Sequence, residues 1–288
     1  MTEKDFDPGT IKALAIDLDG TSIRPDKTMS ARTVTALQAC MARDIRIIIA
    51  TGRAVDSAEK YRRQIGAVGP QVYYNGAEVV DVSAGKTIHT HFVDTEPVLF
   101  CAGLAKEMDL YFQAFFPAGT VNVPCREGYT GEVLVAERMT AEAEKYTRAT
   151  GVEVIKGNLE EYLSGAPAVI KAMFITPEEN HGKIRSRLRE RYGNSLYIVQ
   201  TTPVFLEIMA EGVSKGSGLE HALNYLNLKK ENTIAFGDEE NDLPLFEAAG
   251  FSAAPANAKE TVRKAAMFHI PADTEDGVAV FLEERFKI

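Results

Sequence analysis

The first 80 residues alternate between short apolar runs and longer amphipathic segments. Nearly continuous apolar runs cover residues 11–16, 45–50 and 72–74, as expected for buried strands of a parallel sheet. Between them, residues 30–43 and 54–66 carry apolar positions at helical spacing. The order of these segments predicts a βαβ arrangement around a parallel sheet.

The pattern changes in the middle of the chain, between residues 81 and 202. Strand-like segments are expected at 87–93, 110–116, 168–175 and 196–200, and helix-like segments at 97–108, 140–150 and 178–192. This order predicts a separate α+β layer rather than a continuation of the parallel sheet.

After residue 202 the chain returns to its first pattern. Residues 204–209 are apolar, residues 215–226 have helical spacing, and residues 233–236 form another short buried strand. We therefore expect a discontinuous, doubly wound α/β core of residues 1–82 and 203–288, with an inserted α+β domain of residues 83–202.

Composition excludes several classes of protein. With 45% hydrophobic and 25% charged residues among 288, the chain can bury a core. Its 32 Lys and Arg against 41 Asp and Glu give a net charge of −9, which argues against nucleic acid as a partner. No apolar run approaches the roughly 18 residues of a membrane span. Three cysteines without CxxC spacing fit a reducing compartment, so we expect a cytoplasmic protein. Nothing in the sequence indicates an oligomeric state.

Polar side chains follow three of the predicted strands. Asp17 and Asp19 come after the first strand, Thr51 after the second, and Asp238 after the strand at 233–236. Ligands of open parallel sheets bind outside the carboxyl ends of the strands, so these residues should converge in one crevice.

The residue types in this crevice favour phosphoryl transfer. Asp242 adds a fourth carboxylate to Asp17, Asp19 and Asp238, which together offer hard oxygen ligands to a divalent cation. Lys215 offers a compact positive charge for phosphate. Because no soft ligand accompanies them, Mg²⁺ is the expected metal.

Four motifs follow one another along the chain: Asp-Leu-Asp-Gly-Thr at 17–21, Ala-Thr-Gly-Arg at 50–53, Ser-Lys-Gly at 214–216 and Gly-Asp-Glu-Glu-Asn-Asp at 237–242. In this order they resemble the motifs of the haloacid dehalogenase superfamily, and within it the Cof-type sugar-phosphate phosphatases with a large α/β cap domain. The resemblance covers nearly the whole chain and implies a Rossmann-like core with an inserted cap. The loop at 253–258, Ala-Ala-Pro-Ala-Asn-Ala, departs from the family's usual Gly- and Asn-containing run.

The resemblance implies a role for each catalytic motif residue. Asp17 would attack phosphorus and become an aspartyl-phosphate, and Asp19 would protonate the leaving oxygen and later activate water. The Thr51 hydroxyl, the Gly52 backbone and Lys215 would hold phosphoryl oxygens.

The resemblance also implies how a metal and the remaining fourth-motif residues would be arranged. Mg²⁺ would be held by Asp17, the backbone carbonyl of Asp19, and Asp238. Asp242 would support it through a water or by orienting Lys215. Asn241 would lie close to the phosphate.

Residues elsewhere are weaker candidates. His89 and His91 alternate on a predicted strand and could share a metal, but no third ligand is apparent, so an ordinary exposed pair is favoured. Arg126, Glu127 and Lys171 in the inserted domain could contact a bound sugar.

Together these observations predict a Mg²⁺-dependent phosphatase acting on a small phosphorylated metabolite such as a sugar phosphate. One alternative is a phosphotransferase similar to phosphomannomutase, which would pass the phosphoryl group to a second hydroxyl instead of releasing phosphate. Another is a non-catalytic phospho-metabolite binding protein, which we would expect to lack Asp17, Asp19 or Lys215, and all three are present.

Overall fold

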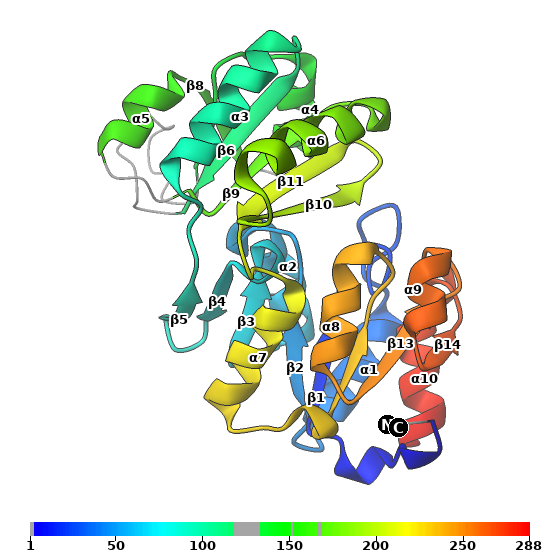
Figure 1. The fold of residues 1–288 in the computed structure, drawn as a ribbon. Helices are drawn as coiled ribbons and strands as arrows, with labels where there is room; N and C mark the ends of the chain where they lie inside the picture. Colours follow the sequence, from blue (N-terminus) through cyan, green and yellow to red (C-terminus); the bar gives the residue numbers. More distant parts are fainter. Residues whose placement is uncertain (1–2, 118–132, 151, 166–168) are drawn as a thin grey trace. The chain divides into compact units, whose positions relative to one another are not determined.

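The computed structural model describes residues 3–117, 133–150, 152–165 and 169–288. The chain divides into two compact units (Figure 1). The first consists of Met1–His89 and Ser214–Ile288, and the second consists of Thr90–Val213. Among the described helices, not one combines the length and the apolar character needed to cross a bilayer.

The first unit is built on a parallel sheet. Its five strands, in spatial order, are β14 (Phe268–Ile270), β13 (Phe251–Pro255), β12 (Thr233–Phe236), β1 (Ala13–Ile16) and β2 (Arg46–Ile49). The chain runs outward from β1 to β2 in one direction and from β12 to β14 in the other. The strand order therefore reverses between β1 and β12, which confirms the predicted doubly wound core and marks the place where such sheets bind ligands.

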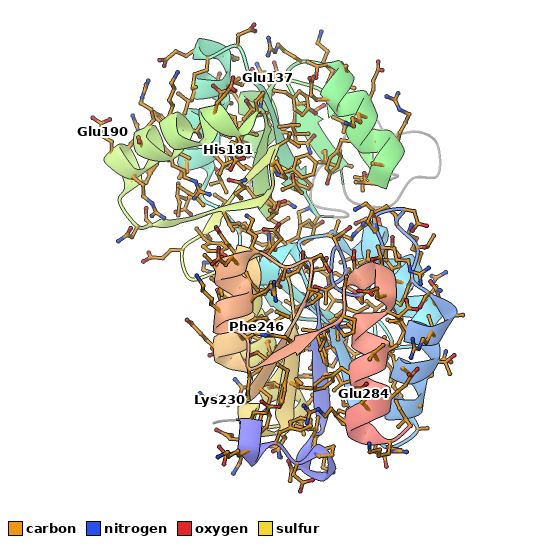
Figure 2. All side chains as sticks on the ribbon, turned by 90° about the vertical axis from the view of Figure 1, so that its right-hand side faces the viewer. Glu137, His181, Glu190, Lys230, Phe246 and Glu284 are labelled. Atoms are coloured by element: carbon orange, nitrogen blue, oxygen red, sulfur yellow. The ribbon has the colours of Figure 1, made fainter. Side chains whose placement is uncertain are left out.

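Helices cover both faces of this sheet. On one face, helices α7 (Lys215–Leu226), α8 (Leu243–Ala248) and α9 (Glu260–Ala265) pack against small side chains of the central strands. Phe246 of α8 lies in this layer (Figure 2). The other face carries α1 (Ala31–Met41) and α10 (Gly277–Phe286), which pack on each other. The sheet is thus buried on both sides, as its continuous apolar strands require.

Local sequence signals set where these helices begin and end. The Ser30 side chain accepts a hydrogen bond from the backbone of Thr33 and starts α1, and Ser214 forms a capping box with Ser217 at the start of α7. Gly66, with φ of 80°, ends α2 (Val55–Ile65) in the left-handed conformation that favours glycine.

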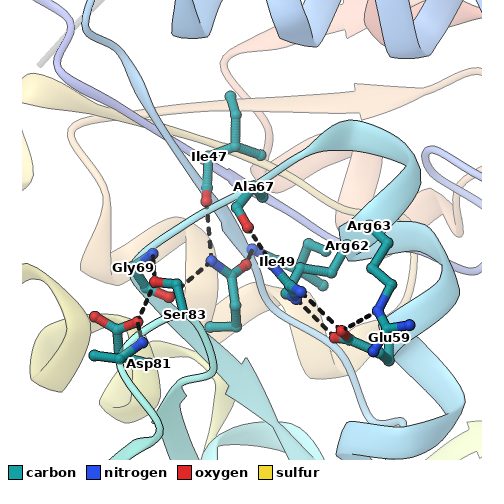
Figure 3. A network of polar contacts seen from close by, with 11 residues as sticks. Ile47, Ile49, Glu59, Arg62, Arg63, Ala67, Gly69, Asp81 and Ser83 are labelled. Atoms are coloured by element: carbon teal, nitrogen blue, oxygen red, sulfur yellow. Dashed lines mark hydrogen bonds and ion pairs between the residues drawn. The ribbon is translucent and has the colours of Figure 1, made fainter.

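A buried glutamine joins the parallel sheet to a second, three-stranded sheet of β3 (Pro70–Tyr73), β4 (Glu78–Asp81) and β5 (Lys86–Thr90). The Gln71 Oε1 atom accepts a hydrogen bond from the Ile49 backbone at 2.8 Å, and its Nε2 donates to the carbonyl oxygens of Ile47 and Gly69 (Figure 3). The Gln71 side chain thus makes hydrogen bonds to the backbone that direct pairing of β2 with β3 would otherwise make. Beyond it, Ala50 and Val72 form a parallel bridge, which places the end of β3 beside the end of β2.

The second unit has its own six-stranded sheet. The strands, in spatial order, are β10 (Leu196–Thr202), β11 (Phe205–Ala210), β9 (Lys171–Ile175), β6 (Tyr111–Phe116), β7 (Val133–Ala136) and β8 (Glu153–Lys156). Helices α3 (Thr95–Glu107), α5 (Leu159–Gly165) and α6 (His181–Tyr192) share one core with one face of this sheet. Helix α4 (Ala141–Thr150) instead brings Tyr146 against Phe115 and Phe205 on the opposite face.

The apolar segment at 204–209, expected in the core, is strand β11 of the second unit. It pairs with β9 on one side and β10 on the other, so the unit extends to Val213 rather than to residue 202. The first unit likewise extends to His89 rather than to residue 82.

Short 3-10 turns connect several of these elements. Their bounds are Glu3–Asp5, Pro8–Thr10, Tyr74–Gly76, Glu178–Asn180, Lys230–Asn232, Glu240–Asp242 and Asp273–Glu275.

Candidate active site

Two carboxyl groups emerge side by side where the strand order reverses. Asp17 directly follows β1, and its backbone N–H donates to the carbonyl oxygen of Phe236, the last residue of β12, at 3.0 Å. Asp238 follows β12 after one glycine. Both are buried, with 5% and 7% exposure. The parallel pairing of β1 with β12 therefore fixes two acidic side chains at one edge of the sheet.

A third acidic residue, Asp242, joins them to form a crowded group. Ligand-capable oxygens of Asp17, Asp238 and Asp242 all lie within 4.8 Å of one another. Burial raises the pKa of Asp17 to about 7. The charge of Lys215 lowers this pKa, and the neighbouring carboxylates raise it. Burial, and then the charges of Asp17 and Asp242, raise the pKa of Asp238 to about 9. A cation placed among these groups would offset their repulsion, and an all-oxygen donor set suits a hard divalent metal.

Lys215 is the positive charge inside this group. Its Nζ lies 2.8 Å from Asp17 Oδ1 and 2.7 Å from Asp242 Oδ1, and its side chain is 1% exposed. Lys215 is the first residue of α7, an end where the helix dipole disfavours a cation. Burial lowers its pKa, but the two carboxylates outweigh burial and raise it, so the ammonium stays charged.

Both oxygens of Asp242 are already engaged. While Oδ1 contacts Lys215, Oδ2 accepts hydrogen bonds from the backbone N–H groups of Asp238 at 2.9 Å and Glu239 at 3.0 Å. Of the two supporting roles expected for Asp242, this arrangement favours orienting Lys215 and the loop over contact with a metal.

Gly20 and Thr21 shape the space beside Asp238. The Thr21 hydroxyl donates to Asp238 Oδ1 at 2.7 Å. Gly20 has φ of +79°, and a Cβ there would lie 2.3 Å from Asp238 Oδ2. A side chain at position 20 would therefore displace the carboxylate, which explains why glycine follows Asp19.

Asp19 points to a different set of partners. Arg53 approaches it with two nitrogens, at 2.6 Å and 2.8 Å, and Lys27 Nζ lies 2.7 Å from Oδ1. Burial raises the pKa of Asp19, but the bonds and charges of Arg53 and Lys27 prevail and lower it to about 2. The Arg53 guanidinium also lies over the Tyr61 ring at 5.3 Å, and the Tyr61 hydroxyl donates to the Lys27 carbonyl oxygen. Asp19 is thus held as a carboxylate by two cations.

Sequence reasoning quoted Arg53 within a motif but gave it no role, and it missed Lys27. The adjacency of Arg53 to Thr51 and Gly52 was an available signal. Nothing in the sequence pairs Lys27 with Asp19, because that contact depends on the turn after Arg24, in which Lys27 has a φ of 64°.

The loop after β2 is held against the end of β3. Thr51 is 1% exposed, and its backbone N–H donates to the Val72 carbonyl oxygen at 3.0 Å. Its hydroxyl oxygen accepts from the Arg53 backbone N–H at 3.1 Å, which leaves the hydroxyl proton available to a ligand. The Asn75 N–H donates to the Thr51 carbonyl oxygen at 2.9 Å.

Asn241 lies on the same side as this loop and contacts Asn75. The Asn241 Nδ2 donates to Asn75 Oδ1 at 2.9 Å, while its Oδ1 is buried and without a hydrogen-bond partner among the described residues. Asn75 was not among the predicted site residues. The Asn-Gly pair at the end of a third buried strand was the signal, since the carboxyl ends of parallel strands meet at one edge.

The remaining candidates have different outcomes. Arg126 and Glu127 fall outside the described residues. Lys171, in the second unit, is 2% exposed, with its Nζ 2.9 Å from Glu207 Oε1, so it is a buried ion-pair partner rather than an exposed charge. The His89 ring stacks on His221 with centroids 3.7 Å apart. Within the described ranges, the only group of three or more possible metal ligands is that of the three aspartates.

Comparison with known proteins shows the family of this chain. The family model of the haloacid dehalogenase-like hydrolases matches residues 14–282. A 5-amino-6-(5-phospho-D-ribitylamino)uracil phosphatase of Bacillus subtilis is 29% identical over 290 residues, covering 96% of this chain and 97% of that protein. An HMP-PP phosphatase of Serratia proteamaculans is 27% identical over 246 residues, covering 85% and 83%.

Solved structures share the fold over the same length. A haloacid dehalogenase-like hydrolase from Bacteroides thetaiotaomicron superposes with a TM-score of 0.80 at 24% identity, covering 95% of this chain and 99% of that one. A crystal structure from Thermotoga maritima gives 0.78 at 26% identity, covering 95% and 97%. With a family model spanning nearly the whole chain and relatives of matching length that are phosphatases, this protein belongs to the haloacid dehalogenase-like hydrolases and is a phosphatase.

Proposed function

We propose that this protein is a Mg²⁺-dependent phosphatase that hydrolyses a small phosphorylated metabolite, such as a sugar phosphate, through an aspartyl-phosphate. The observation that carries the proposal is the buried Lys215 ammonium, within 2.8 Å of both Asp17 and Asp242, beside the carboxylate of Asp238. This grouping supplies a nucleophile, a fixed positive charge and oxygen ligands in one place.

Asp17 is the nucleophile of the proposed reaction. One of its oxygens attacks phosphorus, and the bond from phosphorus to the ester oxygen breaks, which leaves the phosphoryl group on Asp17. Water then attacks the aspartyl-phosphate and releases inorganic phosphate and the free carboxylate. Lys215 holds Asp17 Oδ1 at 2.8 Å and so fixes the orientation of the carboxyl group before substrate arrives.

Thr51, Gly52 and Lys215 are the proposed phosphate-binding groups. The Thr51 hydroxyl can donate its proton because its oxygen already accepts from the Arg53 backbone. The Gly52 N–H offers a second donor, and Lys215 offsets the charge on the phosphoryl oxygens.

Asp19 is the proposed acid and base. As a carboxylate it is ready to take a proton from the water that hydrolyses the intermediate. The earlier step needs a protonated Asp19 that donates to the leaving oxygen. The contacts of Asp19 with Arg53 and Lys27 must therefore loosen when substrate binds, because both cations favour the ionised form.

Asp17, Asp238 and the backbone carbonyl of Asp19 would hold Mg²⁺, and Asn241 would lie close to the phosphate. The fit to the metal rests on the all-oxygen donor set and the crowding of the carboxylates. Bound Mg²⁺ would neutralise charge on the phosphoryl group.

The name of one relative supports the proposed substrate class, and we expect the second unit to select the substrate. A relative of matching length is named for a phosphorylated ribityl compound, which supports a phosphate carried on a sugar-like alcohol. We propose that residues 90–213 act as the cap that selects this substrate. Lys171, one of the residues expected to contact a sugar, is buried in this unit and paired with Glu207.

A panel of phosphorylated metabolites, assayed for inorganic phosphate with wild-type protein and with Asp17→Asn, tests the proposal. We expect release that stops in a chelator, returns with Mg²⁺, and falls by several orders of magnitude in Asp17→Asn, which keeps the side-chain volume. Near wild-type activity of Asp17→Asn, or full activity in excess chelator, would refute it. A phosphoryl group that moves to a second sugar hydroxyl without free phosphate would indicate a mutase instead.

A further inference from the structure

A short loop connects strand β13 to helix α9 in the first unit (Figure 1). It contains most of the run at 253–258 that departs from the usual family sequence. Pro255 ends β13, and the Ala258 N–H donates to the Pro255 carbonyl oxygen at 3.0 Å, so the chain turns sharply here. Because β13 pairs in parallel with β12, this turn lies at the same edge of the sheet as Asp17 and Asp238.

The loop is hydrogen-bonded to the backbone of two motif loops. The Asn257 Nδ2 donates to the carbonyl oxygen of Gly20, in the first motif, at 2.7 Å. Two residues later, the Lys259 N–H donates to the carbonyl oxygen of Asp238, in the fourth motif, at 3.0 Å. One short segment thus connects the two loops that would hold Mg²⁺.

The Asn257 side chain is also held at its other end. Its Oδ1 accepts a hydrogen bond from the Asp273 N–H at 3.0 Å, in the turn that precedes α10. An amide suits this place, because the Gly20 carbonyl oxygen needs a donor and the Asp273 N–H needs an acceptor. The two partners therefore determine the orientation of the amide.

The bond to Gly20 fixes a peptide group beside the proposed metal ligands. The Gly20 carbonyl belongs to the peptide that joins Gly20 to Thr21, and the Thr21 hydroxyl donates to Asp238 Oδ1 at 2.7 Å. On its other side, Gly20 follows Asp19, whose backbone carbonyl is a proposed Mg²⁺ ligand. Glycine has the greatest backbone freedom of any residue, so a bond from outside the loop is needed to hold this peptide in one orientation.

We propose that Asn257 is a positioning residue that fixes the Gly20 peptide and so holds the first-motif loop in the arrangement that binds Mg²⁺. This inference rests on the proposed Mg²⁺-dependent function. It assigns a role to a residue that lies outside the four motifs and touches neither the metal nor the phosphate.

Asn257→Asp is the variant that separates the two bonds of the side chain. A carboxylate can still accept from the Asp273 N–H, but it cannot donate to the Gly20 carbonyl oxygen. Its added negative charge would by itself strengthen the binding of a cation, so weaker Mg²⁺ binding cannot come from the charge.

Asn232→Asp is the matched control. The Asn232 Nδ2 donates to the carbonyl oxygen of Thr10 at 2.8 Å, so this variant loses the same kind of bond and gains the same charge. The contact lies at the opposite end of the strands, because Thr10 comes before β1 and Asn232 directly precedes β12. Titration calorimetry of substrate-free protein with MgCl₂ measures the dissociation constant without relying on turnover.

We expect Asn257→Asp to weaken Mg²⁺ binding about fivefold or more, as the loss of one hydrogen bond allows, and Asn232→Asp to leave it within about twofold of wild type. At saturating Mg²⁺, the substrate KM of Asn257→Asp should stay within about twofold of wild type, because Asn257 does not contact the phosphate. Unchanged Mg²⁺ affinity in Asn257→Asp, equal weakening in both variants, or a raised KM alone would overturn the proposal.

If Asn257→Asp does not fold, Asn257→Ala answers the same question. It loses both bonds and adds no charge, so it should also weaken Mg²⁺ binding about fivefold or more, and wild-type affinity would refute the role of Asn257. Wild-type protein that binds no Mg²⁺ would instead refute the proposed function, and with it the part that Asn257 plays in metal binding.

Discussion

Replacing Lys215 with methionine removes the one ammonium buried among the three site aspartates. Methionine keeps most of the length of the side chain but leaves Asp17 Oδ1 and Asp242 Oδ1 without the cation that now lies 2.8 Å and 2.7 Å from them. Both carboxylates are buried, with side-chain exposures of 7% and 0%. Little water can reach them to replace the lysine.

The loss of stability follows from this burial. Breaking a buried ion pair by removing one partner costs about 3 to 5 kcal/mol, because the remaining charge is left uncompensated. Lys215→Met leaves Asp17 and Asp242 without their cation, and Asp17, whose pKa burial already raises to about 7, then takes up a proton, so we expect a loss within that range. Adding Asp242→Asn removes the remaining charge, and the double variant should recover at least about 1 kcal/mol relative to Lys215→Met.

Urea unfolding in a chelator, followed by far-UV circular dichroism because the chain has no tryptophan, measures these differences. The control is Lys27→Met, since Lys27 also lies 2.7 Å from a carboxylate, Asp19, but the two side chains are 55% and 39% exposed. An exposed pair contributes less than about 1 kcal/mol. Equal losses in Lys215→Met and Lys27→Met, or a double variant less stable than Lys215→Met, would refute the reasoning.

Three further results are expected. Asp19→Asn should reduce kcat/KM for an alkyl phosphate at least about tenfold more than for an activated aryl phosphate, which needs no proton; equal losses would show that Asp19 is not the acid. Gly76→Ala should lower the free energy of unfolding by at least about 2 kcal/mol, because a Cβ at φ of +99° would lie 1.9 Å from the Ser214 carbonyl oxygen, and an unchanged urea midpoint would contradict this. Burial raises the pKa of Glu78 from 4.5 to about 7, so its stabilising contribution is present below pH 4.5 and is lost as pH rises through 7. Glu78→Gln should therefore gain roughly 2 kcal/mol relative to wild type between pH 5 and pH 8, and parallel pH profiles would rule this out.

The parts of the fold that local signals determine were predictable. The helix at 215–226 and the strand at 233–236 match the structure because a serine cap, apolar spacing and a polar strand end act over a few residues. Strands β7 and β8, both in the second unit, were missed. The apolar run of β11 was recognised, but its sequence does not specify which sheet it joins, because the neighbours that determine this, β9 and β10, are its pairing partners.

In the candidate site, too, some positions could be predicted from the sequence and others could not. Asp17, Thr51 and Asp238 each follow a buried strand, so their convergence could be inferred from sheet geometry alone. The partners of Asp19 could not, because they depend on the turn that carries Lys27 in a left-handed conformation.

The central strand of the first unit has consequences for how the protein is made. Ala13 of β1 pairs with Thr233 of β12, which is synthesised 220 residues later. At roughly 5 to 20 residues per second, the ribosome needs about 10 to 40 s to cover that distance. During this time β1 can pair with β2 but exposes its other edge, a template for wrong pairing. The second unit is continuous in sequence and can fold first. We therefore expect chaperones to engage the nascent first unit, and chains that terminate before Thr233 to aggregate rather than persist as a soluble fragment.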